Sequence, residues 1–296
     1  MASANSLKQN SPSDSAEDVY ALIEQSFFGD GGAPSVSVVQ NAFRHHFNVV
    51  GNGSRIVLTR QCAQALGIEE CDICCLASAV ECLHNASLVQ DDLQDQSALR
   101  RGQPSVVAHF GSDVALGLTD QLITTAFVCL AGVSATKRLP QLISQINRAV
   151  SETVDGQTRE LSGRLNGCAV DAYLCAAKKK SGPLFALSLE LPLIFANHAA
   201  SVEAAHEIAC QFGLGYQILD DLKDRKSDPQ TECSGNIVFA LQETENNQTA
   251  LKSAAVMAEQ LLREASDRAR LLPFGCGSPL IDLVDRLLPQ VDAFKS

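Results

Sequence analysis

The amino-acid sequence predicts an all-α protein built as one large helical bundle. Apolar residues recur with helical spacing along most of the 296 residues. No run of alternating β-branched residues bounded by hairpin turns is found, and no internal repeat or long low-complexity linker divides the chain. We therefore expect a single domain over residues 16–296, preceded by a polar, disordered tail over residues 1–15.

The first half of the chain is expected to form six helices. Segments rich in Gly, Pro, Ser and Asn separate several of them: "GDGGAPS" follows the first helix, "VVGNGS" the second and "RRGQPS" the fourth. The stretches between these segments keep the helical period of apolar residues. The expected ranges are 16–28, 35–48, 54–66, 70–93, 106–133 and 138–165.

The second half is expected to form six further helices, with breaks at "SDPQTECSG" and "PFGCGSP". Its longest apolar run, "GPLFALSLELPLIFANHAA", is interrupted by Pro183, Glu190 and Pro192, so we expect no membrane span there. The expected ranges are 168–177, 180–199, 201–225, 236–244, 247–268 and 278–293.

The cysteines indicate reduced thiols rather than a disulfide framework or a metal site. There are eleven of them, an odd number, without framework spacing or a secretion signal, which favours a cytoplasmic protein. Four of them fall on one stripe of the expected helix 70–93, and four ligands on one rigid helix cannot surround a tetrahedral zinc ion. Free Cys usually behaves as a small apolar residue, so we expect reduced thiols and not zinc ligands at Cys71, Cys74, Cys75 and Cys82.

The net charge of −11 argues against nucleic acid as the main partner. An acidic protein can still bind an anionic ligand if metal cations lie between the two. Two acidic motifs of the form D-D-x-x-D offer such a place. They occur in "SLVQDDLQDQSALRRGQPS" and in "GLGYQILDDLKDRKSD", and they comprise Asp91, Asp92, Asp95, Asp220, Asp221 and Asp224.

Each acidic motif closes an apolar helix, and its first and last aspartates share one helical face. If the two faces look at each other across a bundle, they form a cavity walled by carboxylates. Mg²⁺ prefers such oxygen ligands and usually completes its octahedron with water and substrate phosphate. A lone D-D-x-x-D is often a solvated helix end, as Asp224 beside Arg225 and Lys226 illustrates, but two copies on apolar helices favour a metal site.

Basic residues beside these motifs suit the ionisation of a diphosphate ester. Metal ions neutralise the oxygens on which charge builds as the diphosphate leaves. Arg and Lys side chains stabilise the same charge without reorganising. Arg100 and Arg101 follow the first motif directly and can donate paired hydrogen bonds to phosphate oxygens.

These motifs together resemble the trans-isoprenyl diphosphate synthases, the polyprenyl synthetase family that includes farnesyl and geranylgeranyl diphosphate synthases. The similar blocks are "ECLHNASLVQDDLQDQSALRRGQPSVVAHFG", "VDGQTREL", "KKKSGPLF" and "GLGYQILDDLKD", in the family's order from about residue 50 to about residue 240. The resemblance implies an isoprenoid-synthase helical bundle with a central cavity. It also implies a homodimer that condenses an allylic diphosphate with isopentenyl diphosphate.

The resemblance also implies a role for individual residues. The six aspartates of the two motifs would bind Mg²⁺, about three ions when diphosphate is present. Arg100, Lys180 and Gln217 would contact the allylic diphosphate, with Lys223 assisting at the second motif. Arg55, His84 and Arg101 would hold isopentenyl diphosphate. The residue types alone leave other roles open, since His84 could be a buried core histidine and Gln217 a packing amide.

One block departs from the family pattern. Where members carry Gly-Gly-Lys-Arg-x-Arg-Pro, this chain reads "GNGSRIV", so Asn52 stands at the Lys position, Gly53 replaces an Arg and only Arg55 remains. Losing a cation that contacts a diphosphate costs about 1.5–3 kcal/mol. The segment "RKSDPQTECSGN" after Asp224 is also shorter than in the family. The resemblance therefore predicts a weakened isopentenyl diphosphate site.

Small residues before the first motif, Ala86 and Ser87, with Leu83 and Val80 deeper, favour a product of about geranylgeranyl length or longer. Two alternatives stay open. A non-elongating class I terpene synthase or prenyltransferase would explain the missing Lys, although such enzymes usually carry a different second motif. A non-catalytic partner subunit of a prenyl synthase is the other, although such subunits tend to lose the aspartates that this chain keeps.

Overall fold

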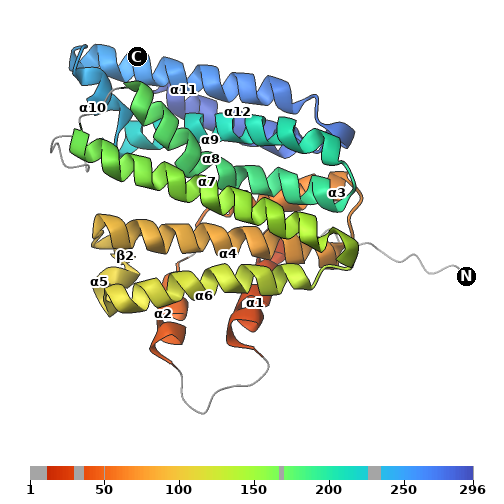
Figure 1. The fold of residues 1–296 in the computed structure, drawn as a ribbon. Coiled ribbons are helices and arrows are strands. Elements are labelled where there is room, and N and C mark those ends of the chain that lie inside the picture. The colour runs from red at the N-terminus through yellow and green to blue at the C-terminus, as the bar shows by residue number, and fades with distance from the viewer. Residues whose placement is uncertain (1–11, 30–36, 50, 167–169, 226–234, 296) are drawn as a thin grey trace, which may run out of the picture. The chain divides into compact units, whose positions relative to one another are not determined.

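The computed structural model describes residues 12–29, 37–49, 51–166, 170–225 and 235–295. Within these ranges the chain forms twelve α-helices, three short 3-10 helices and one two-stranded antiparallel pair (Figure 1), which confirms the all-α prediction. The chain divides into two compact units. The first comprises Met1–Val57 and Cys74–Val133, and the second comprises Leu58–Ile73 and Ser134–Ser296. The single domain expected from the sequence stays a prediction.

The first unit is built around aromatic and aliphatic side chains between its helices. The rings of Phe27, Phe28, Phe43 and Phe47 from two helices pack in edge-to-face and tilted pairs, with centroids 4.2–5.4 Å apart. Its elements are α1 (Pro12–Phe28), α2 (Val38–Phe47), most of α4 (Glu70–Asp95), β1 (Leu99–Arg100), β2 (Gln103–Pro104), α5 (Val106–Phe110) and α6 (Ser112–Ala131).

The strand pair forms a tight turn directly after the first acidic motif. Leu99 pairs with Pro104, and Arg100 pairs with Gln103. The two residues between the strands, Arg101 and Gly102, both have positive φ, at 53° and 78°. Two consecutive residues of this kind make the hairpin turn that suits the natural twist of paired strands. The strands are too short for the alternating pattern that would have predicted them.

The second unit is a layered helical bundle in which α7 packs on α8, α8 on α9, α9 on α11, and α11 on α12 (Figure 1). A continuous core of buried apolar residues runs through it, including Phe185 and Phe212, whose rings meet edge to face at 5.0 Å. Its elements are most of α3 (Ser54–Ala65), η1 (Thr136–Arg138), α7 (Leu139–Asn166), α8 (Val170–Phe195), η2 (Ala199–Ser201), α9 (Val202–Asp224), α10 (Ile237–Gln242), α11 (Asn247–Ala269), η3 (Pro273–Gly275) and α12 (Ser278–Asp292).

Most helix boundaries lie within three residues of the sequence prediction, and the three largest differences are these. Helix α1 begins at Pro12, so residues 12–15 belong to it and only residues 1–11 of the expected tail lie outside the described residues. The expected helix 106–133 is two helices, because Gly111 has φ 87° and ends α5. The expected helices 168–177 and 180–199 are one, α8, which continues through Pro183.

Packing explains why α8 does not break at Pro183. A proline inside a helix removes a hydrogen bond and crowds the preceding turn. Here residues 182–194 of α8 are all buried, and Gly182 lies so close to α9 that an added Cβ would be 2.7 Å from Cys210 Cα. The burial of this stretch against α9 outweighs the local cost of the proline.

By length and composition alone, two of the described helices, α4 and α6, could cross a membrane. In the most apolar window, 78% of the α4 residues and 44% of the α6 residues are buried by protein. A core helix of a water-soluble protein passes the same test, so this is weak evidence for a span. The expectation that the chain does not insert stably into a membrane stays a prediction.

Candidate functional site

The first acidic motif lies in the last turn of α4, and Arg100 returns to it from β1. The Arg100 guanidinium donates from Nη2 and Nε to the Asp92 carboxylate, at 2.6 Å and 3.0 Å from Oδ1. Arg100 Nη2 also lies 3.4 Å from Asp91 Oδ2. The chain reverses just after α4, where Gln96 has φ 51° and the Ser97 backbone N–H donates to the Asp92 carbonyl oxygen at 3.0 Å. Asp92 is buried, Asp91 is partly exposed and Asp95 is exposed.

These contacts shift the pKa values of Asp92 and Arg100. Burial raises the pKa of Asp92, while the hydrogen bond and charge of Arg100 oppose that rise. Burial lowers the pKa of Arg100, but its bonds to Asp92 and Asp91 outweigh the burial, so the net shift is upward. The motif therefore holds a cation of the chain itself, Arg100, against two of its carboxylates.

Arg55 and His84, both predicted to bind isopentenyl diphosphate, lie together in the first unit. Arg55 Nη1 is 3.3 Å from His84 Nε2. Burial, and then the charges of Arg55 and Arg101, lower the pKa of His84 well below its ordinary value. A neutral His84 accepts a hydrogen bond from Arg55 at Nε2. Arg101 donates from Nη1 to the Val49 carbonyl oxygen at 2.9 Å, which fixes the third predicted residue of this group.

A buried polar network that the sequence reasoning missed lies beside this group. Glu81 is 3% exposed, and its Oε1 accepts from Asn85 Nδ2 at 2.9 Å and from the Tyr20 hydroxyl at 3.3 Å. Asn85 Oδ1 in turn lies 3.0 Å from His46 Nε2. Burial raises the pKa of Glu81, against the charges of Arg55 and Arg101. The three-residue spacing of Glu81 and His84 was the available signal for this network.

Asn52, at the position of the family Lys, has a local structural role. Its Oδ1 accepts from the Ser54 backbone N–H at 3.1 Å and from the Ser54 hydroxyl at 2.9 Å. This is a side-chain turn that precedes the first turn of α3. The residue supplies no positive charge. The weakened isopentenyl diphosphate site expected from the sequence stays a prediction.

The second acidic motif lies at the end of α9, and its three carboxylates differ in surroundings. Asp220 is partly exposed and lies 3.5 Å from Lys223 Nζ, one turn away. Asp224 is exposed. Asp221 is 6% exposed and accepts hydrogen bonds from the Tyr173 hydroxyl, from Gln217 Nε2 and from the Ile237 backbone N–H. The segment 226–234, which contains most of the short loop noted in the sequence, lies outside the described residues.

Lys180 and Gln217, both predicted to contact the allylic diphosphate, also have protein partners. Lys180 Nζ is 2.8 Å from Glu160 Oε2. Gln217 Oε1 accepts from the Ser181 hydroxyl at 2.7 Å. The sequence reasoning missed both partners, although each lies within a block that resembles the family: Glu160 in "VDGQTREL" and Ser181 in "KKKSGPLF".

The residues of both acidic motifs fit Mg²⁺ by chemistry. Their donors are carboxylate oxygens, and the first motif already holds a guanidinium against two of them. Among the described residues, no three His, Cys, Asp or Glu side chains are gathered closely enough to hold a metal ion by themselves. A Mg²⁺ ion usually takes one or two protein carboxylates and completes its shell with phosphate and water. Mg²⁺ binding by either motif stays a prediction. The prediction that both motifs line one cavity stays a prediction.

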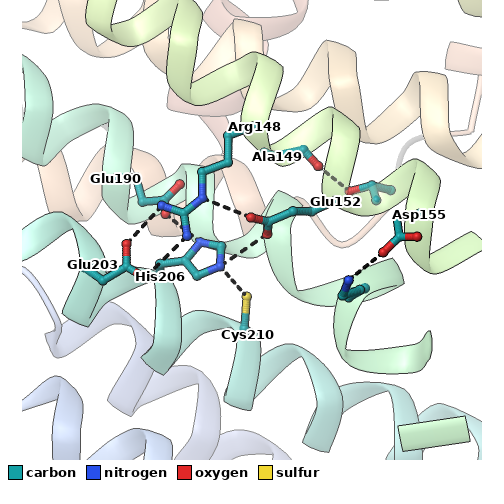
Figure 2. Close-up of polar contacts among 10 residues, drawn as sticks. Arg148, Ala149, Glu152, Asp155, Glu190, Glu203, His206 and Cys210 are labelled. Atoms are coloured by element: carbon teal, nitrogen blue, oxygen red, sulfur yellow. Dashed lines mark hydrogen bonds and ion pairs between the residues drawn. The ribbon is translucent and has the colours of Figure 1, made fainter. Parts of the chain in front are cut away.

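A separate ionic cluster links α7, α8 and α9 (Figure 2). Its centre is His206, whose Nδ1 lies 2.8 Å from Oε1 of the fully buried Glu190 and whose Nε2 lies 3.3 Å from Glu152 Oε2. Cys210 Sγ is 3.4 Å from the same Nε2. Arg148 bridges Glu152 and Glu203. The buried Cys210 thiol therefore has a polar partner.

Comparison with known proteins matches the polyprenyl synthetase family over residues 36–256. The chain is 34% identical over 209 residues to a geranylgeranyl diphosphate synthase of Pseudescherichia vulneris, covering 68% of this chain. It is 30% identical over 214 residues to an all-trans-nonaprenyl-diphosphate synthase (geranyl-diphosphate specific) of Rhodobacter capsulatus, covering 72% of this chain. The chain spans less than two thirds of the length of these curated relatives, 66% and 64%.

The fold agrees with this match. A solved structure of a geranylgeranyl pyrophosphate synthetase from the archaeon Geoglobus acetivorans superposes with a TM-score of 0.81 at 24% identity, covering 93% of this chain and 98% of the other. A decaprenyl diphosphate synthase from Rhodobacter capsulatus superposes with a TM-score of 0.79 at 19% identity, covering 94% and 97%. With its acidic motifs and their basic partners in place, the chain belongs to the polyprenyl synthetase family.

Proposed function

We propose that the chain is a Mg²⁺-dependent trans-prenyltransferase. It condenses an allylic diphosphate with isopentenyl diphosphate and releases a medium-chain polyprenyl diphosphate, of about geranylgeranyl length or longer. The observation that carries the proposal is the first acidic motif with Arg100 drawn onto Asp91 and Asp92. An acidic helix end that holds its own cation is suited to bind metal ions and the diphosphate between them.

The allylic diphosphate is bound through charge. Five carboxylates would hold Mg²⁺, and when bound the metal neutralises the leaving diphosphate. Arg100 and Lys180 donate hydrogen bonds to its oxygens, after exchanging their present carboxylate partners for phosphate. Gln217 adds a neutral donor. The metal-binding carboxylates in this proposal are Asp91, Asp92, Asp95, Asp220 and Asp224.

Isopentenyl diphosphate is bound by the group around His84. Arg55 and Arg101 supply the positive charge, and the neutral His84 holds Arg55 in place through Nε2. The bond between the allylic carbon and its diphosphate breaks, and the double bond of isopentenyl diphosphate attacks that allylic carbon. A proton then leaves the adduct for the released diphosphate, so the charges balance without a further co-reactant. The small Ala86 and Ser87 favour the longer products.

We further propose that the enzyme is cytoplasmic and acts as a homodimer.

A second candidate function is supported by Asn52. Its side chain hydrogen-bonds within a turn and brings no cation to the residues proposed to bind isopentenyl diphosphate. In this second case the chain ionises the allylic diphosphate and passes the carbocation to another acceptor. The two candidates share the acidic motifs and differ only in the acceptor.

The test is an incubation of the full chain with Mg²⁺, isopentenyl diphosphate and, in turn, dimethylallyl, geranyl and farnesyl diphosphates. Products are dephosphorylated and identified by mass, and the Asp91→Ala/Asp95→Ala double variant serves as the control. A ladder of longer prenyl alcohols that the control lacks supports the synthase and gives its chain length. Release of diphosphate without elongation supports the second candidate. No reaction with any primer contradicts both and favours a non-catalytic partner subunit.

A further inference from the structure

The middle carboxylate of the second acidic motif has surroundings unlike those of the other two. Asp221 is 6% exposed, whereas Asp220 is partly exposed and Asp224 is exposed. On a helix, adjacent residues point about 100° apart, so Asp221 faces the bundle when Asp220 and Asp224 face outward. The motif therefore presents two carboxylates on one face and a third within the protein.

Within the part of the chain that the structure describes, donors from three elements meet the Asp221 carboxylate. The Tyr173 hydroxyl of α8 donates to Oδ2 at 2.6 Å, and the Ile237 backbone N–H at the start of α10 donates to the same oxygen at 2.8 Å. Gln217 Nε2, one turn earlier on α9, donates to Oδ1 at 3.0 Å. If Asp221 turned toward a metal, a buried hydroxyl and a buried N–H would lose their acceptor.

The same residue also holds α10 through its backbone. Asn236 Nδ2 donates to the Asp221 carbonyl oxygen at 3.0 Å, while Asn236 Oδ1 accepts from the Val238 N–H at 2.9 Å and caps α10. The start of α10 is thus tied to α9 by both the side chain and the main chain of Asp221. Ile237 and Val238 are both fully buried.

Asp221 further decides how the Gln217 amide is oriented. A carboxylate only accepts, so the amide nitrogen of Gln217 must face Asp221. The amide oxygen then faces the Ser181 hydroxyl, which donates to it at 2.7 Å. Both ends of the amide are fixed, and the second N–H of Gln217 is left to donate in a set direction. Ser181 directly follows Lys180. This chain of hydrogen bonds therefore joins α8 and α9 beside residues that are predicted to bind the diphosphate.

We propose that Asp221 is a positioning residue and not a metal ligand. It orients Gln217 toward the diphosphate and fixes the start of α10, while Asp220 and Asp224 supply the carboxylates that face the metal. The metal assignment made for Asp221 from the sequence is replaced by this role. The part of the inference that concerns Mg²⁺ and diphosphate rests on the proposed function. The structural half, that Asp221 fixes Gln217 and the start of α10, rests on the hydrogen bonds alone.

The test compares Asp221→Asn with the matched neighbour Asp220→Asn in the full chain. Thermal unfolding is measured without ligand and with inorganic pyrophosphate over a range of Mg²⁺ concentrations. For Asp221→Asn we expect a melting temperature lower by about 3 °C or more and less than about a twofold change in the Mg²⁺ concentration at half-maximal shift. For Asp220→Asn we expect a melting temperature unchanged within about 1 °C and a Mg²⁺ requirement raised about tenfold or more.

A second measurement separates positioning from general damage. At saturating Mg²⁺ we expect Asp221→Asn and Gln217→Ala each to weaken pyrophosphate binding, and the double variant to be no weaker than Gln217→Ala alone, because Asp221 acts through Gln217. Tyr173→Phe keeps every charge and covers the case in which Asp221→Asn does not fold. It should lower the melting temperature and leave the Mg²⁺ requirement unchanged.

The outcomes are distinct. If Asp221→Asn raises the Mg²⁺ requirement as much as Asp220→Asn without a loss of melting temperature, Asp221 is a ligand and the inference is overturned. Additive losses of pyrophosphate binding in the Asp221→Asn/Gln217→Ala double variant overturn it too. If the wild-type chain shows no shift with Mg²⁺ and pyrophosphate, the proposed function fails. The structural half can then still be tested by a double-mutant cycle that measures the interaction free energy of Asp221 and Tyr173 in unfolding. If the two residues show no interaction free energy, the structural half is overturned.

Discussion

Arg100 Nη2 lies 2.6 Å from Asp92 Oδ1 and 3.4 Å from Asp91 Oδ2, so one guanidinium serves two carboxylates of the same acidic motif. The Asp92 side chain is 1% exposed and the Arg100 side chain 28%. The carboxylate is thus removed from water and depends on a nearby cation to stay ionised. In the proposed reaction Mg²⁺ would replace Arg100 as the cation beside the Asp92 carboxylate.

The first prediction concerns this pair. We expect Arg100→Gln to lower the free energy of unfolding by about 1–3 kcal/mol, because a buried carboxylate loses its cation while the partial exposure of Arg100 limits the loss. Mg²⁺ should then raise the melting temperature of the variant more than that of the wild type, since the metal takes the place of the guanidinium. Thermal unfolding with and without Mg²⁺ measures both effects. Equal Mg²⁺ shifts in the two proteins would contradict the prediction.

A second prediction concerns Asn52. Restoring the cation with Asn52→Lys should lower the KM for isopentenyl diphosphate about tenfold, the smallest effect expected of a charged hydrogen bond. The change removes the bonds to Ser54, so the free energy of unfolding should fall by about 1 kcal/mol, as for other lost helix-entry bonds. Asn52→Ala is the control, with the same loss of stability and no gain in KM. A KM that does not respond to Lys would place Asn52 away from the substrate.

Much of the fold could be predicted because its signals are local. Helix α3 spans residues 54–65 where 54–66 was expected, and α11 spans 247–269 where 247–268 was expected. Apolar periodicity and Gly- or Pro-rich breaks define such elements without reference to the rest of the chain. The continuity of α8 could not be predicted in this way. A break was expected at residues 178–179, and only the structure shows α8 running through this point to Gly182, which packs against Cys210 of α9.

The residues of the candidate site were also predictable only where the signal is local in the sequence. The motifs predicted which residues carry charge, and the structure brings Arg100 to Asp91 and Asp92 as the chemistry requires. The partners were missed because they come from distant positions. Tyr173 lies 48 residues before Asp221, and Tyr20 lies 61 residues before Glu81. No spacing rule connects such pairs, so the difference between a metal-facing aspartate and a buried one is not visible in the letters D-D-x-x-D.

A third prediction tests how closely α7 and α8 pack. A Cβ added at Gly156 would lie 2.4 Å from the Lys180 backbone nitrogen and 2.6 Å from the Lys179 carbonyl carbon. Backbone atoms cannot move aside cheaply, so we expect Gly156→Ala to lower the free energy of unfolding by about 1–3 kcal/mol. It should also reduce diphosphate binding, because the displaced segment carries Lys180. Chemical denaturation and pyrophosphate titration measure the two effects.

The matched control for Gly156 is Gly117 in α6, where an added Cβ would meet only Val39 Cγ2 at 3.6 Å, an ordinary contact. Alanine favours a helix interior over glycine by about 0.5–1 kcal/mol. Gly117→Ala should therefore leave stability unchanged or raise it slightly. If both substitutions change stability alike, close packing at Gly156 is not the cause.

The fourth prediction concerns the ionic cluster around His206 (Figure 2). Hydrogen bonds with Cys210 and then with Glu190 raise the pKa of His206 from its ordinary 6.5 to about 10. The neighbouring charges are Arg148 and Glu152 on α7, Glu190 on α8 and Glu203 on α9. The folded chain therefore keeps a proton on the imidazole at pH values where the unfolded chain has lost it.

The sign of the pH dependence follows from this difference. Below about pH 6.5 both states hold the proton, and the stabilisation by the cluster is fully present. Between about pH 6.5 and about pH 10 the folded state binds more protons than the unfolded state, so stability falls as the pH rises. The contribution, at most about 5 kcal/mol, is lost above the folded pKa. Melting temperatures measured from pH 6 to pH 10 should record this decline.

Two variants show whether His206 causes the decline. His206→Gln removes the titrating group, so its melting temperature should depend less on pH over the same range and start lower at pH 6. Glu190→Gln keeps an acceptor for Nδ1 but removes a buried negative charge, so the pKa of His206 should fall and the decline should end at a lower pH. A His206→Gln curve parallel to that of the wild type would assign the pH dependence to other groups and show that the imidazolium contributes nothing to the packing of α7, α8 and α9.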